Sequence, residues 1–273
     1  MDLRIENWKD NLKQQKPDYQ FGEHVHIVDE KIYMPQLDKH RQVWIYLPKS
    51  YKDSEKKYPV LYMHDGQNLF HAKPARNDEW AVDTTVDNLI REGLQEMIIV
   101  GINHGEEDRL TEYNPYDNEN GKGEGKEYLR FLVKTLMPMI NEQYRTLTEM
   151  NHTAIAGSSL GGLISMFAIA EYPKVFGSAG IFSPAFWLAP EIYTDVTDRL
   201  PGLVENKIFL VAGDKEGTEM VNNVKKIYAI LNPDGSNKNI VFHECEDGKH
   251  TEWFWHREFP AFYSFITKKQ TLK

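Results

Sequence analysis

The chain has 273 residues, of which 41% are hydrophobic and 27% are charged, so it holds enough apolar side chains for a sizeable globular core. Its 32 basic and 41 acidic residues give a net charge of -9, which argues against nucleic acid or an anionic membrane surface as a partner, because both require a basic surface. No apolar run approaches the roughly 20 residues of a membrane-spanning helix.

The N-terminal segment and the cysteine content bear on where the protein resides. The opening run MDLRIENWKDNLKQQKPDYQ is polar and charged and lacks the apolar stretch of a secretory signal, although a chain with its signal trimmed would look the same. The single cysteine, Cys245, leaves no intramolecular disulfide to form, which is compatible with a reducing compartment. The sequence therefore predicts a cytoplasmic protein with an N-terminal extension over residues 1–21.

Short β-rich runs and helical patterns alternate along the chain. Several β-rich runs, such as VLYM, MIIVGI and IFLVAG, are continuously apolar, which is typical of strands buried on both faces of a parallel sheet. The predicted strands are residues 24–33, 42–47, 59–63, 97–102, 153–157, 176–182, 207–212 and 240–244. The predicted helices are residues 79–91, 127–144, 159–171, 218–231 and 252–267.

This alternation predicts an α/β fold in one domain over residues 1–273, with a mostly parallel central sheet of about eight strands flanked by helices. The first two strands are joined by a short polar turn and are expected to form an antiparallel edge. Residues 105–126 are crowded with Gly, Asn, Asp and Pro. We expect a long loop there, and loops of that length often carry function.

The sharpest motif is a G-x-S-x-G, formed by Gly157, Ser158, Ser159, Leu160 and Gly161. It follows an apolar β-rich run and opens an apolar helical pattern, which is the strand–turn–helix setting that a nucleophilic serine requires. Small residues two positions to either side let the strand and the helix approach each other around a strained turn. Ser159 is the predicted nucleophile, because Ser158 lacks the symmetric glycines; the alternative is a Gly/Ser-rich turn without catalysis.

A serine hydroxyl needs a base to take its proton, and in this arrangement an acid and then a histidine follow the serine along the chain. The run KIFLVAGDKEG offers Asp214 and Glu216 after a strand, and IVFHECEDGKH offers His250 after the next one. His243 lies inside a β-rich run and His256 inside an aromatic-rich helix, so the loop residue His250 is the predicted base. Either carboxylate could orient the imidazole.

Two backbone amides are candidates for an oxyanion hole. The first is the N–H of Leu160, directly after the nucleophile and at the N-terminus of a helix. The second lies in the loop after YPVLYM, where Gly66 permits a tight turn and the N–H of Gln67 could point at the oxyanion. For that segment considered alone, a plain Asp-Gly turn is the alternative.

The sequence predicts neither a metal site nor a cofactor. His24 and His26 lie two residues apart and so face the same side of a strand, but we find no neighbouring set of Cys or carboxylate residues that completes a cluster. We interpret this pair as sheet surface. The chain contains neither a G-x-G-x-x-G motif nor a P-loop.

With these residues assembled, the chain resembles the putative-esterase family of α/β-hydrolases. That family includes enterochelin esterases, feruloyl and acetylxylan esterases of carbohydrate esterase family one, S-formylglutathione hydrolases and mycolyltransferases. The resemblance covers roughly residues 41–265 and is carried by YPVLYMHDGQNLF, the W-x-x-D of residues 80–83, RLTEYNP, AGSSLGG, SPAFW, AGDKEG and GKHTEWFW. The DGQN form is most similar to the enterochelin-esterase and feruloyl-esterase branches.

The resemblance implies an α/β-hydrolase fold with Ser159 as the nucleophile and His250 as the base. In that family the acid commonly sits three residues after the glycine that closes its strand. This position is Glu216, which the resemblance favours over Asp214. A glutamate departs from the aspartate that many relatives carry there.

The resemblance also implies a substrate pocket. By similarity Trp187 would lie near it, and Arg109 with Glu112 would brace a loop beneath it, as an ion pair rather than as substrate contacts. Aromatic side chains could line the pocket for a hydroxycinnamoyl group, although such residues are also ordinary core. The further candidates for its wall are Asp65, Trp80, Tyr113 and Trp253.

Together these features predict a serine esterase without a cofactor. Its substrate would be a small acyl, acetyl or hydroxycinnamoyl ester, free or linked to a carbohydrate, and it would act through an acyl-enzyme. The alternatives are an acyltransferase that uses a sugar or lipid alcohol, and an enterochelin-type siderophore esterase. A non-catalytic protein that binds glycans or a partner is a further alternative, although each catalytic position holds a competent residue. The oligomeric state is left open.

Overall fold

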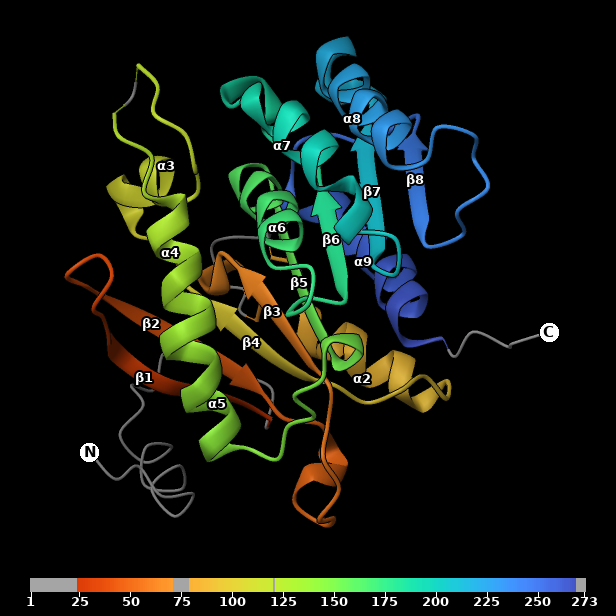
Figure 1. Ribbon diagram of the computed structural model, residues 1–273. Coiled ribbons are helices and arrows are strands. Elements are labelled where there is room, and N and C mark those ends of the chain that lie inside the picture. Colours follow the sequence, from red (N-terminus) through yellow and green to blue (C-terminus); the bar gives the residue numbers. More distant parts are fainter. Residues whose placement is uncertain (1–23, 71–78, 120, 269–273) are drawn as a thin grey trace.

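A computed structural model describes residues 24–70, 79–119 and 121–268, so the predicted extension over residues 1–21 lies outside the described part. Within it the chain forms an eight-stranded sheet in the order β1-β2-β4-β3-β5-β6-β7-β8, with helices on both faces (Figure 1). The strands are β1 (Val25–Met34), β2 (Lys39–Tyr46), β3 (Val60–His64), β4 (Ile98–Ile102), β5 (Thr153–Ser158), β6 (Ser178–Phe182), β7 (Lys207–Gly213) and β8 (Ile240–Cys245).

The sheet is mostly parallel. Strands β3 to β8 pair in parallel, whereas β2 pairs antiparallel with both β1 and β4. The predicted α/β fold and its antiparallel edge are thus confirmed; an isolated bridge between Tyr58 and Thr146 lies outside the eight strands. Every residue of β3, β4 and β5 is buried, which explains why these strands read as uninterrupted apolar runs.

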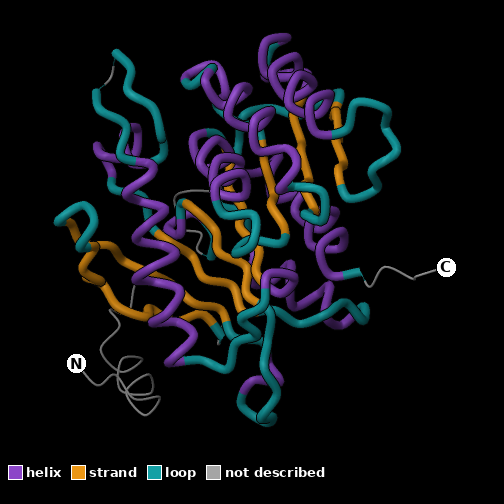
Figure 2. The backbone as a smooth tube through the Cα atoms, viewed as in Figure 1, coloured by secondary structure: helices purple, strands orange, loops and turns teal. Residues whose placement is uncertain are grey.

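Helices cover the sheet in two layers, and loops join them to the strands (Figure 2). One face carries α4 (Gly125–Phe131), α5 (Met137–Gln143), α6 (Leu160–Glu171), α7 (Glu191–Arg199) and α8 (Thr218–Leu231), and the other carries α2 (Val82–Arg91) and α9 (Glu252–Thr267) (Figure 1). The short α3 (Arg109–Glu112) lies within the predicted long loop. Among the described residues, no helix combines the length and the apolar character that crossing a bilayer demands.

Two helical predictions need correction. The single helix expected over residues 127–144 is divided into α4 and α5 by a π-helical turn, Leu132–Leu136. Pro138 lies two residues after this turn. It has no N–H for the helix ladder and its ring would clash with the carbonyl four residues earlier, and a widened turn relieves that clash. Helix α7 was not predicted, because only Ile192 and Val196 of its residues are buried and its apolar stripe is correspondingly thin.

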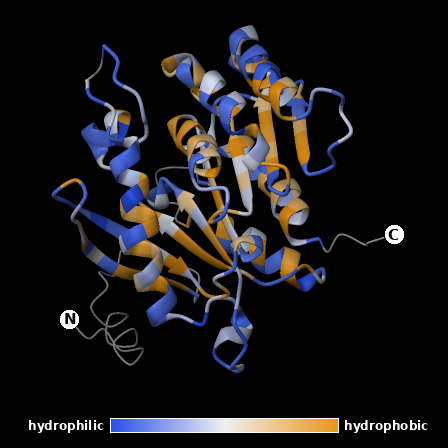
Figure 3. Cartoon of the chain, viewed as in Figure 1, coloured by the Kyte–Doolittle hydropathy of each residue, from blue (hydrophilic) through white to orange (hydrophobic). Residues whose placement is uncertain are grey.

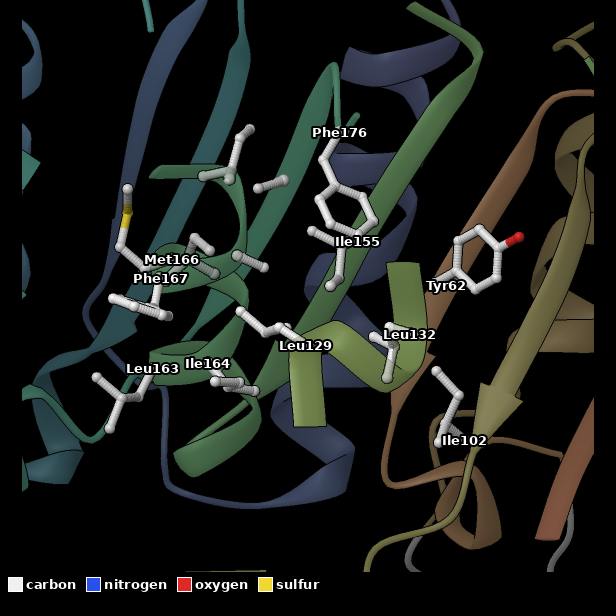
Figure 4. Packing of buried hydrophobic residues seen from close by; sticks show 14 of the residues in the cluster. Tyr62, Ile102, Leu129, Leu132, Ile155, Leu163, Ile164, Met166, Phe167 and Phe176 are labelled. Atoms are coloured by element: carbon white, nitrogen blue, oxygen red, sulfur yellow. The ribbon is translucent and has the colours of Figure 1, made fainter. Parts of the chain in front are cut away.

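The sheet separates two apolar clusters. Along β3, Val60 and Tyr62 face the cluster under α4 to α8, whereas Leu61 and Met63 face the cluster under α2 and α9. Strands β7 and β8 are predominantly hydrophobic, whereas hydrophobic and hydrophilic residues alternate along α8 (Figure 3). In the first cluster, side chains from α6 interdigitate with side chains from the sheet and from the α4 region (Figure 4); the labelled residues include Ile155, Leu163, Ile164, Phe167, Leu129 and Leu132.

A charged pair is buried beside β2. Arg41 Nη2 lies 2.7 Å from each carboxylate oxygen of Glu112, and the two side chains are 5% and 0% exposed. Lys39 Nζ lies 3.3 Å from the same carboxylate. Burial raises the pKa of the Glu112 carboxyl, and the charge of Arg41 opposes that rise. Glu112 therefore pairs with Arg41, not with Arg109 as expected.

We expect Arg41→Ala to lower the free energy of unfolding by about 3–5 kcal/mol, because it leaves the Glu112 carboxylate buried without its main partner. Urea denaturation measures this loss. Lys49→Ala is the control: Lys49 forms an exposed pair with Asp87 at 3.1 Å, and its removal should cost less than about 1 kcal/mol. Replacing the pair together, by Arg41→Met with Glu112→Leu, should cost less than Arg41→Ala alone; equal costs for all three would contradict the buried pair.

Candidate active site

Ser159 occupies a sharp turn between β5 and α6. Its backbone angles are φ 58° and ψ -119°, a region that residues with a side chain rarely adopt. The turn is held from both sides, since the Ser159 N–H donates to Phe182 O and its carbonyl accepts from the Ala185 N–H, each at 2.9 Å. Ser159 is partly exposed, whereas Ser158 is buried. A partly exposed serine on a constrained turn is the arrangement that the motif predicts.

The glycines of the motif allow the strand and the helix to touch. A methyl group on Gly157 would lie 2.8 Å from backbone atoms of Gly161, and a methyl group on Gly161 would lie 3.2 Å from the His64 Cβ and from an oxygen of Asp65. Gly157 therefore requires the smallest residue, and at Gly161 a larger residue would force its neighbours to shift. This close approach also brings the end of β3 against the turn.

Glu216 and His250 are in direct contact. His250 Nδ1 lies 2.7 Å from Glu216 Oε2; the carboxylate is 1% exposed and the imidazole 38% exposed. Because a carboxylate only accepts hydrogen bonds, Nδ1 is the donor, and the neutral imidazole then carries its lone pair on Nε2. Asp214, the alternative acid, has an exposed side chain.

Parallel strands explain why these distant segments lie at one edge of the sheet. Ser159 follows β5, Glu216 follows β7 and His250 follows β8, and the carboxyl ends of neighbouring parallel strands lie at one edge of the sheet. The loops after β7 and β8 also touch directly: a methyl group on Gly213 would lie 2.3 Å from the backbone of Gly248. The competing histidines lie on regular elements, His243 on β8 and His256 on α9.

The loop after β3 supplies the second predicted oxyanion amide. A 3-10 turn, Gly66–Asn68, places Gln67 there, and the Gln67 side-chain oxygen accepts the His104 N–H at 3.2 Å. The left-handed residue of this turn is Asp65, at φ 57°. Gly66 is needed for space, since a methyl group there would lie 2.7 Å from the carbonyl carbon of Gly101.

The other candidate amide belongs to Leu160, the first residue of α6. A helix leaves its first N–H groups without an acceptor in the helix itself, and the helix dipole adds partial positive charge there. Leu160 and Gln67 therefore offer backbone N–H groups just after two neighbouring strands, β5 and β3, at the edge where Ser159 lies.

Arg109 ties the loop after β3 to the serine turn. Its Nε and Nη2 donate to the two carboxylate oxygens of Asp65, at 2.7 and 2.9 Å, and Nη2 lies 3.5 Å from Ser158 O. Asp65 was expected in the pocket wall, but both of its oxygens are bonded to Arg109. Arg109 was expected to pair with Glu112, and this interpretation is wrong.

The aromatic residues expected around the substrate divide into two groups. Trp187 and Trp253 are 51% and 57% exposed. Trp80 and Tyr113 are buried, and the Trp80 ring centroid lies 4.9 Å from that of Phe182. Trp80 and Tyr113 are therefore core residues rather than open pocket walls.

Two residues that were not predicted lie next to Glu216 and His250. The Ser183 hydroxyl lies 2.7 Å from Glu216 Oε1, and Trp255 Nε1 donates to Ser183 Oγ at 2.9 Å. Both lie within the segments SPAFW and GKHTEWFW that carry the family resemblance. Since no spacing rule assigns a role to a serine or a tryptophan at these positions, proximity to the acid was needed to find them.

A metal site would need several His, Cys, Asp or Glu side chains close together. In the ranges that the structure describes, no cluster of three or more His, Cys, Asp or Glu side chains is placed to hold a metal ion. His26, interpreted as sheet surface, is buried, and this burial lowers its pKa to about 4.

The chain is similar to known proteins and to solved structures. The family described as "Putative esterase" matches residues 35–261. "Uncharacterized protein YbbA" of Bacillus subtilis (strain 168) is 28% identical over 223 residues, which cover 76% of this chain and 84% of that protein. The "Endo-1,4-beta-xylanase/feruloyl esterase" of Xylanibacter ruminicola is 29% identical over 186 residues, 65% of this chain and 23% of that protein. A solved ferulic acid esterase shares the fold, with a TM-score of 0.70 at 23% identity over 89% of this chain and 98% of that one.

The strained turn makes a prediction about stability alone. We expect the free energy of unfolding of Ser159→Gly to be about 1 kcal/mol higher than that of Ser159→Ala, because glycine adopts this backbone conformation without strain. At Ser165, inside α6, the order should reverse, with alanine about 1 kcal/mol better than glycine. Chemical denaturation of the four variants checks both differences. The same order at both positions would contradict a strained turn at Ser159.

Proposed function

Because the chain belongs to the "Putative esterase" family, we propose that it is a serine esterase that hydrolyses carboxylic esters through an acyl-enzyme on Ser159. The observation that carries the proposal is the 2.7 Å contact between His250 Nδ1 and Glu216 Oε2, at the sheet edge where the strained serine turn also lies. An acid, a base and a constrained hydroxyl at one edge are the components of acyl transfer.

In the first half of the reaction, Ser159 Oγ attacks the ester carbonyl carbon while His250 Nε2 takes the hydroxyl proton. Glu216 holds the imidazole and stabilises the positive charge that forms on it. The N–H groups of Leu160 and Gln67 donate to the oxyanion of the tetrahedral intermediate. His250 then gives its proton to the leaving alcohol as the C–O bond breaks, and the acyl group stays on the serine.

In the second half, a water molecule attacks the acyl-enzyme while His250 accepts one of its protons. Collapse of the second intermediate releases the carboxylic acid, and the proton returns to Ser159. The pair formed by Arg109 and Asp65 contributes indirectly, because it fixes the loop that carries Gln67 relative to the serine turn. Preorganised N–H donors to the oxyanion, such as those proposed for Leu160 and Gln67, are usually the largest single contribution to the rate enhancement of acyl transfer.

Ser159→Ala and His250→Ala should each lower kcat by about 10⁶-fold, and Glu216→Ala by about 10⁴-fold, as expected for a nucleophile, a base and an orienting acid. Hydrolysis of p-nitrophenyl acetate measures these losses. Asp214→Asn is the matched control for the acid and should stay close to the unmodified protein. Full activity of Ser159→Ala would refute the mechanism. A large loss of activity in Asp214→Asn, together with an active Glu216→Ala, would mean that Asp214 and not Glu216 is the orienting acid.

For the substrate, we propose an aromatic acyl ester of the hydroxycinnamoyl type, free or attached to a carbohydrate. Two exposed indoles, Trp187 and Trp253, support this class, because aromatic faces stack on both aromatic acids and sugar rings. Trp187 lies two residues after Ala185, whose N–H is bonded to Ser159 O. The feruloyl esterase activity in the name of the Xylanibacter relative agrees with this class.

Acetyl, feruloyl and catecholate esters assayed side by side test the substrate class, and we expect the highest kcat/KM on the feruloyl ester. Trp187→Ala should raise KM for that ester by about threefold to tenfold, which corresponds to the loss of one aromatic contact. Tyr33→Ala, which removes another exposed aromatic ring from the edge strand β1, is the control. A preference for the catecholate ester would favour the siderophore esterase, and acyl transfer to added alcohols in the product analysis would favour the acyltransferase.

A further inference from the structure

A chain of hydrogen bonds leads from α9 to the base. Trp255 Nε1 donates to Ser183 Oγ at 2.9 Å, the Ser183 hydroxyl lies 2.7 Å from Glu216 Oε1, and Glu216 Oε2 lies 2.7 Å from His250 Nδ1. The four residues come from the loops after β6, β7 and β8 and from the first turn of α9.

The direction of each bond follows from the chemistry of the groups. An indole N–H can only donate, so Ser183 Oγ accepts from Trp255. An ionised carboxylate can only accept, so the hydroxyl hydrogen of Ser183 points to Glu216. The Trp255 indole thus orients the Ser183 hydroxyl by donating to its oxygen, and the hydroxyl in turn donates its hydrogen bond to Glu216.

Ser183 is held in place by its backbone as well. It is fully buried, its φ is 42°, and its N–H donates to Val211 O on β7 at 2.8 Å. A non-glycine residue at positive φ is kept only where its surroundings enforce it. The backbone of Ser183 therefore holds the Cα, from which the hydroxyl side chain extends, in a fixed position.

The two oxygens of Glu216 are used differently. Oε1 accepts both the Ser183 hydroxyl and the Gly213 N–H, at 2.7 and 2.8 Å, whereas Oε2 faces His250. The carboxylate cannot rotate without breaking these bonds. The Trp255 ring meets the His250 ring edge-on, with centroids 5.0 Å apart and planes at 86°. The same indole thus packs against the base and, through Ser183, orients the acid.

We propose that Ser183 and Trp255 are positioning residues that fix the acid–base pair, an inference that rests on the proposed function. They hold one carboxylate oxygen so that the other is presented to His250 Nδ1, and they limit the movement of the imidazole. Neither reaches the reacting atoms. Their removal should therefore lower kcat and leave KM nearly unchanged.

The test compares Ser183→Ala and Trp255→Phe with the unmodified protein on p-nitrophenyl acetate, with active enzyme counted by titration with a fluorophosphonate. We expect Ser183→Ala to lower kcat by about 10- to 100-fold, because it removes a hydrogen bond to a charged group, and Trp255→Phe to lower kcat by no more than that, because it removes the bond that orients the Ser183 hydroxyl; KM should stay within about twofold. In a Glu216→Ala background Ser183→Ala should have no further effect on kcat, because the group through which Ser183 acts is gone, and neither should Trp255→Phe, which keeps an aromatic ring against His250.

Matched controls remove similar buried bonds elsewhere. Trp44→Phe removes an indole N–H bonded to Asn103 Oδ1 at 2.8 Å, and Thr267→Val removes a hydroxyl bonded to Tyr263 O at 2.7 Å, near the far end of α9. Both should keep the kcat of the unmodified protein. An equal loss in the controls, or the same loss with and without Glu216, would mean that Ser183 and Trp255 serve folding alone and would overturn the inference.

Failure of the inference is distinguishable from failure of the proposed function. If Ser159→Ala abolishes activity while Ser183→Ala and Trp255→Phe stay fully active, the esterase mechanism stands and the positioning role is refuted. Full activity without the Ser159 hydroxyl refutes the mechanism, and the positioning role with it.

Discussion

The conformation of Ser159 is the constraint on which the rest of the site depends. A residue at φ 58° and ψ -119° costs roughly 1–3 kcal/mol, and it persists only if its surroundings determine it. Here the surroundings are a fully buried strand before it and a helix whose residues Leu160 to Ala170 are all buried after it. Gly157 and Gly161 let the two elements meet. Core packing therefore maintains the strain that leaves the hydroxyl at the surface of the sheet edge.

The parallel sheet extends this constraint to the other groups. Five neighbouring strands, β3, β5, β6, β7 and β8, end at one edge, and each of their loops contributes to the site. The loops are joined to one another by short contacts, such as the one between Gly213 and Gly248 and the ion pair of Arg109 with Asp65. A loop with so many fixed neighbours has little freedom to move, so the site is preorganised by its backbone.

Much of this arrangement could be predicted from the sequence, because its signals are local. Apolar runs mark the buried strands, and G-x-S-x-G marks a turn whose backbone requirement is the same wherever it occurs. What could not be predicted is which side chain pairs with which across the fold. Arg109 bonds Asp65 instead of Glu112, and Trp80 lies in the core, because such contacts depend on the relative position of segments far apart in the chain. Ser183 was missed for the same reason.

The order of the elements along the chain has a consequence for synthesis. His250 follows β8 and precedes α9, so the ribosome makes Ser159 and Glu216 well before His250 and the helix that packs behind it. Until α9 has emerged, the cluster under α2 lacks Phe254, Phe259 and Phe262. If Ser159, Glu216 and His250 act together as proposed, a nascent chain lacks its base until the segment after β8 is made, and the emergence of α9 then completes the core.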